Sequence, residues 1–161
     1  MEFFNSPSVS RIMGITLRQL RHWVDSGLIH PVEVEETGGQ KRFHFDFRNL
    51  VEIALVLALK KRSLSLQQIK RALEVFNQEF VPSDSIQHLT FFSDGQSFFS
   101  LSRDPQGIFE VLRRGQTIFA VPMDDLAREV AGRTDLAEKD IPLTLARGKK
   151  DGNYVLIKFK F

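Results

Sequence analysis

The chain has 161 residues, 42% of them hydrophobic, and a formal net charge of +2, so it suits one or two small globular domains and its bulk charge does not point to a polyanion. It has no cysteine, which excludes a disulfide framework, a thiolate metal site and a cysteine nucleophile. No apolar run approaches the roughly 18 residues of a membrane span, and the first residues do not resemble a signal peptide. We therefore expect a cytoplasmic protein that does not enter a membrane.

The N-terminal region has the pattern of two short helices joined by a tight turn. Ser6 is expected to cap the first helix, with a proline beside it in the first turn, and Gly14 to end it. In the second helix Thr16 and Gln19 have the spacing of a capping box, and Gly27 marks its end. The predicted buried stripe of this helix consists of Leu20, Trp23 and Val24. These features predict a helix-turn-helix.

Residues 32–45 alternate apolar and polar side chains around a pair of glycines, which predicts a β-hairpin. Asp46 is a suitable N-cap for a third helix that continues to about Lys61 and is expected to bury one apolar face. Ser65 begins a second capping-box pattern and with it a fourth helix.

The sequence pattern of the second half of the chain predicts a different unit, which contains a sheet. The expected elements are a hairpin at 89–101 around an Asp-Gly turn, a helix at 104–114, a strand at 116–121, a helix at 123–131 and a last strand at 154–159. We therefore predict an α+β protein, with a winged helix-turn-helix domain at 1–80 followed by a small α+β domain at 85–161.

The run 14–31 resembles the signature of the MerR family of transcription regulators. That signature has Gly-Val-Ser, two free positions, Thr-Leu-Arg-Tyr-Tyr, three free positions, and then Gly-Leu, an apolar residue, one free position and Pro. Here Gln19 stands at the Thr position, and His22 and Trp23 stand at the two Tyr positions. The segment Ser65-Leu66-Gln67-Gln68-Ile69 also resembles the family's Ser-Leu-x-x-Ile helix start, so the likeness covers about residues 5–77.

The resemblance implies that the second helix enters the major groove of double-stranded DNA, with the hairpin as a wing. By the family's motif Arg21 would contact a phosphate and His22 the DNA backbone. Arg18 and Gln19 are candidates for base edges, because arginine suits guanine and glutamine suits adenine. The alternative is that these residues form an ordinary solvated helix face. The predicted DNA-binding residues are Thr16, Arg18, Gln19, Arg21, His22, Lys41 and Arg42.

The wing departs from the family's pattern. Lys41 and Arg42 could contact DNA phosphates or could be plain solvated turn residues. The acids Glu33, Glu35 and Glu36 lie on the opposite strand, where they would repel phosphates unless the hairpin points them away.

An enzyme is not expected. The four histidines do not have the spacing of a metal site, and no glycine-rich loop matches a phosphate cradle. We therefore predict no catalytic, cofactor-binding or metal site.

The helix from Ser65 ends before Pro82, so it is shorter than the long coiled-coil helix that joins two subunits in MerR-like regulators. We expect a homodimer held instead through the C-terminal half, which could also hold an effector. The predicted function is sequence-specific transcription regulation. The alternative is an antitoxin-like protein, whose winged domain regulates its own promoter and whose C-terminal domain binds a protein partner.

Overall fold

The computed structural model of the chain describes residues 3–79, 90–93, 98–100 and 119–134. The N-terminal elements are β1 (Phe4–Asn5), α1 (Ser6–Met13), α2 (Leu17–Asp25), β2 (Glu33–Thr37), β3 (Gln40–Phe45), α3 (Phe47–Lys61) and α4 (Leu66–Glu79). They are followed by β4 (Thr90–Ser93), β5 (Phe98–Ser100), β6 (Phe119–Pro122) and α6 (Met123–Arg133). The strands form two antiparallel sheets, in the orders β1-β3-β2 and β5-β4-β6, which confirms the predicted α+β class.

Helices α1 and α2 form the predicted helix-turn-helix. The N-cap of α1 is Asn5 and not Ser6, because the Asn5 Oδ1 accepts a hydrogen bond from the Ser8 backbone N–H at 2.9 Å. Asparagine is as good an N-cap as serine, and it makes Ser6 the first helical residue. Gly14 ends α1 in the left-handed conformation, with φ of 66°, so the chain turns directly into α2.

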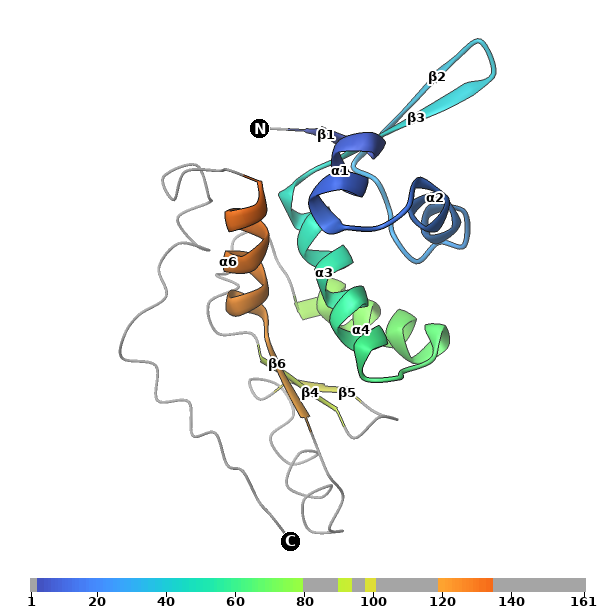
Figure 1. Ribbon diagram of the computed structural model, residues 1–161. Helices are drawn as coiled ribbons and strands as arrows, with labels where there is room; N and C mark the ends of the chain where they lie inside the picture. The colour runs from blue at the N-terminus through green and yellow to red at the C-terminus, as the bar shows by residue number, and fades with distance from the viewer. Residues whose placement is uncertain (1–2, 80–89, 94–97, 101–118, 135–161) are drawn as a thin grey trace, which may run out of the picture.

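Strands β2 and β3 form the predicted hairpin, which projects from the rest of the protein (Figure 1). Its two-residue turn is Gly38-Gly39, with φ of 61° and 77°. Positive φ at both central residues is the requirement of the tight turn whose twist matches that of the strands. We call this hairpin, β2 with β3, the wing.

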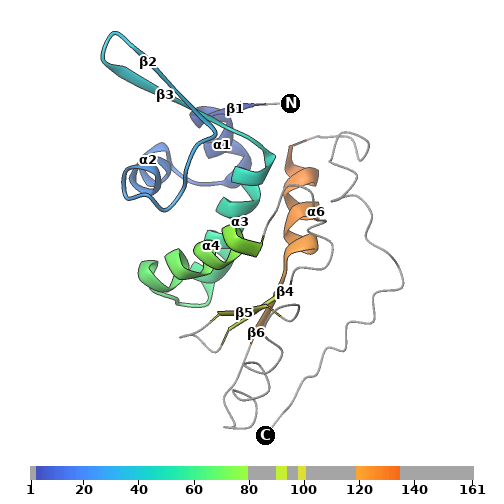
Figure 2. The same ribbon diagram turned by 180° about the vertical axis from the view of Figure 1, so that it is seen from behind.

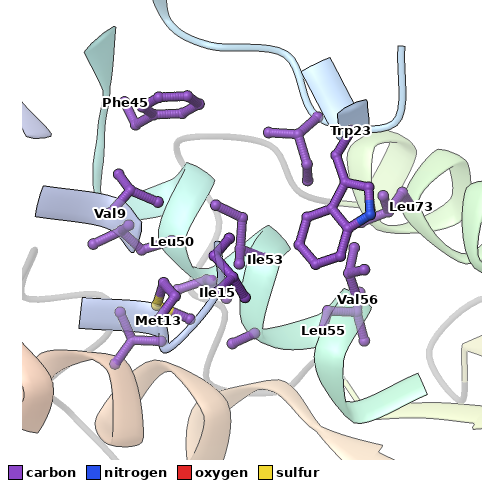
Figure 3. Packing of buried hydrophobic residues seen from close by; sticks show 14 of the residues in the cluster. Val9, Met13, Ile15, Trp23, Phe45, Leu50, Ile53, Leu55, Val56 and Leu73 are labelled. Atoms are coloured by element: carbon purple, nitrogen blue, oxygen red, sulfur yellow. The ribbon is translucent and has the colours of Figure 1, made fainter. Parts of the chain in front are cut away.

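Helix α3 lies at the centre of the protein and begins at the predicted cap, Asp46. The expectation that it buries a single face is wrong, since every residue from Asn49 to Val56 is buried. The reason is that α1, α4, α6 and β3 pack around it, so neighbours cover several of its sides. Figure 3 shows part of this core, in which Ile53 and Val56 of α3 lie with Trp23 of α2.

Helix α6 packs against α3 and α1, on the side of α3 away from α2 (Figures 1 and 2). Its residues Met123, Ala127 and Val130 are buried in the same hydrophobic cluster as the N-terminal helices. The segment between the two predicted domains, 81–84, lies outside the described residues, as do the predicted Asp-Gly turn, the helix at 104–114 and the strand at 154–159. Among the described helices, none has the length and apolar character needed to cross a membrane.

Candidate nucleic-acid interface

One face of helix α2 packs against the core, and the opposite face is exposed to solvent. Leu20 and Trp23 are only 1% and 2% exposed and anchor the helix to the core. The opposite face is exposed, and it presents Leu17, Arg18, Arg21, His22 and Asp25 to solvent, with Gln19 at its edge. The predicted orientation of this helix is therefore confirmed, although Val24, the third residue of the predicted stripe, is only partly buried.

Thr16 and Gln19 form the capping box that begins α2. The Thr16 Oγ1 accepts a hydrogen bond from the Gln19 backbone N–H at 3.1 Å, and the Gln19 Oε1 accepts one from the Thr16 backbone N–H at 3.0 Å. A bidentate contact with adenine needs both ends of a glutamine amide. Gln19 would therefore have to leave the cap to read adenine in this way, so its capping role competes with its predicted role at a base edge.

Arg21 lies between its own helix and the wing. Its Nε–H donates to both carboxylate oxygens of Asp25, one helical turn further along α2. Its guanidinium carbon lies 5.0 Å from the centroid of the Phe43 ring in β3. The side chain is still 52% exposed, so it is accessible to a partner while it is held from two sides.

The wing carries each basic side chain opposite an acid. In the strand register Lys41 pairs with Glu36, and Arg42 pairs with Glu35. Because side chains alternate along a strand, Lys41 and Arg42 point to opposite faces of the hairpin. Both are exposed, and the acids beside them reduce the positive potential that the wing can offer a phosphate.

A buried polar network fixes the loop between α2 and the wing. The Asn49 side-chain amide donates to the His30 carbonyl at 2.9 Å and to the Glu52 Oε2 at 3.0 Å. Burial raises the pKa of the Glu52 carboxyl, and the hydrogen bond from Asn49 and the nearby Arg48 oppose this shift only in part. Asn49 and Glu52 do not stand out in the sequence, where their only signal is a pair of polar residues within the apolar α3 segment.

Comparison with known proteins relates the N-terminal region to a family of regulators. The family model described as MerR HTH family regulatory protein matches residues 4–75. Relatives include uncharacterized HTH-type transcriptional regulators of Mycobacterium bovis and Mycobacterium tuberculosis. Each is 26% identical over 129 residues, which is 80% of this chain and 56% of the relative. The chain thus spans about half the length of the curated relatives it matches.

Proposed function

We propose that the chain binds double-stranded DNA and regulates transcription in the cytoplasm, without enzymatic activity, because residues 4–75 match the model of the MerR family of regulatory proteins. In this proposal α2 lies in the major groove and the wing lies along the DNA backbone. The observation that carries it is the exposed face of α2, which displays Arg18, Arg21 and His22 above a buried apolar stripe.

The exposed residues of α2 suit different parts of a duplex. Arg21 faces the wing and is assigned to a phosphate, which fixes register without reading sequence. Arg18 and His22 are four residues apart and share one line along the helix. Arg18 lies in the first turn, the part of a recognition helix that contacts base edges, and arginine pairs well with guanine.

The remaining candidates have supporting roles. Thr16 holds the N-terminus of α2 through the capping box, and Gln19 keeps an amide N–H₂ that could donate to a base or a phosphate while its oxygen remains in the cap. Lys41 and Arg42 are assigned to phosphates on either side of the wing. Because Glu36 and Glu35 lie opposite them, the wing is expected to bind DNA more weakly than α2.

The proposal is tested with a duplex selected from random sequences by the full chain. Arg21→Ala should weaken binding to the selected duplex and to unrelated duplexes alike. The slope of log K against log salt concentration should fall in magnitude by about 0.9, the value for one lost phosphate contact.

Arg128→Ala is the matched control. Arg128 lies on α6, is also 52% exposed and also pairs with an aspartate on its own helix, Asp125, but α6 lies on the opposite side of α3 from α2 (Figure 2). Its replacement should leave both affinity and salt slope unchanged. A selection that enriches no sequence would contradict the proposed function, and an unchanged slope in the Arg21 variant would contradict the phosphate role.

A further inference from the structure

Arg21 is held by one contact within its own helix, to Asp25, and by one contact to Phe43 of β3, 22 residues further along the chain. Its Nε–H donates to the Asp25 carboxylate at 3.1 and 3.2 Å, and its guanidinium lies over the Phe43 ring. We propose that Phe43 and Asp25 are positioning residues for Arg21, which hold its guanidinium in one orientation towards a DNA phosphate and so join the recognition helix to the wing. This inference rests on the proposed function for its DNA partner.

Phe43 can act as a fixed platform because it belongs to the core. It is 7% exposed, and its ring packs edge-on against Phe45, with the centroids 6.5 Å apart and the planes at 64°. Phe45 is completely buried. A cation over an aromatic face within about 6 Å is attracted to it, so the hydrophobic core determines where this guanidinium lies.

The two contacts leave the useful donors of Arg21 available. Arginine has five N–H groups in a planar fork, and Asp25 engages only the one on Nε. Within the described part of the chain, the four N–H groups on the terminal nitrogens have no hydrogen-bond partner. A pair of parallel N–H groups matches the spacing of two phosphate oxygens. Arg21 is therefore oriented in advance for a bidentate contact.

The Arg21–Asp25 ion pair could instead stabilise the fold, but its exposure argues against that role. The side chains of Arg21 and Asp25 are 52% and 58% exposed, and ion pairs this exposed contribute little to stability. Their effect should therefore be on DNA binding, because an arginine that is already ordered loses less conformational freedom when it meets a phosphate.

The test uses Phe43→Leu, which keeps an apolar side chain but removes the aromatic face, and Phe43→Tyr, which keeps that face. The probe is the duplex selected by the parent protein. Phe43→Leu should weaken binding about two- to fivefold, the range for a contact of this kind at a partly exposed site, and Phe43→Tyr should bind like the parent. In an Arg21→Ala background, Phe43→Leu should have no further effect.

A measurement without DNA gives an independent readout. The aromatic ring should shift the NMR signals of the Arg21 side-chain protons, and the shift should disappear in Phe43→Leu and persist in Phe43→Tyr. Asp25→Ala, a change at an exposed site, should accelerate hydrogen exchange at the Arg21 Nε–H, whereas Asp25→Asn keeps an acceptor and should not.

The outcomes separate the two proposals. If Phe43→Leu weakens the Arg21→Ala protein as much as the parent, or if the Arg21 signals do not respond to the ring, the positioning role is wrong. If the parent binds no duplex, the proposed function is wrong, and the NMR comparison still decides whether Phe43 and Asp25 order Arg21.

Discussion

At the residue scale, Glu52 makes the stability of the protein depend on pH. Its carboxyl is buried in α3, and burial raises its pKa above the ordinary glutamate value. The folded state therefore binds a proton more tightly than the unfolded state, and the free energy of unfolding falls as pH rises through the window between the ordinary pKa and the raised one. Above that window the Glu52 carboxyl is ionised in the folded state as well, and the free energy of unfolding is lowered by the full cost of burying its charge.

We predict that Glu52→Gln reduces this loss of stability. A glutamine can still accept the hydrogen bond from Asn49, but it does not ionise. Urea unfolding across the window should show a smaller decrease with pH in the variant than in the parent. Glu74→Gln, at an exposed position of α4, is the control and should follow the parent. Parallel curves for parent and Glu52→Gln would contradict the prediction.

The residue contacts at the candidate interface show which features a sequence can reveal. The exposure of Arg18, Arg21 and His22 follows from helical periodicity once Leu20 and Trp23 are taken as buried. The contact between Arg21 and Phe43 could not be predicted, because it joins residues 22 positions apart that only the tertiary fold brings together. The buried Asn49–Glu52 pair was missed for the same reason, since its partner is a carbonyl in a distant loop.

At the scale of single elements, the N-cap of α2 should set both the stability and the placement of that helix. Thr16→Ala removes the acceptor of the Gln19 N–H and should lower the free energy of unfolding by about 1 kcal/mol. Thr16→Ser keeps a hydroxyl and should remain close to the parent. Chemical denaturation measures both variants. Equal losses in the two would show that the methyl group, and not the cap, stabilises this turn.

Elements with strong local signals were predicted well. Both glycines of the wing turn and the caps at Thr16 and Asp46 lie where local chemistry requires them. Strand β1 was missed because its two residues carry no periodic pattern and form a strand only by pairing with β3. The all-round burial of α3 likewise depends on α6, a helix more than 60 residues away in the sequence.

At the scale of the whole molecule, the buried contact between α6 and the N-terminal helices limits how the two halves can be studied. Val130 and Met123 of α6 are 1% and 0% exposed, and they belong to the cluster that includes Met13 and Ala54. A chain cut after α4 would expose this apolar surface to water, which is unfavourable. Tests of assembly therefore need the full chain.

The prediction at this scale is that the full chain is a homodimer joined through residues after position 82. A single DNA-binding module buries only about 600–1,000 Å², whereas a two-fold dimer reads two half-sites about one helical turn apart. Light scattering should give twice the mass of one chain, and the selected duplex should contain two related half-sites. Scrambling one half-site should weaken binding strongly, because the second subunit then has only non-specific contacts. A monomeric mass, together with equal affinity for the intact and the half-scrambled duplex, would show that one copy of the chain is the complete DNA-binding unit.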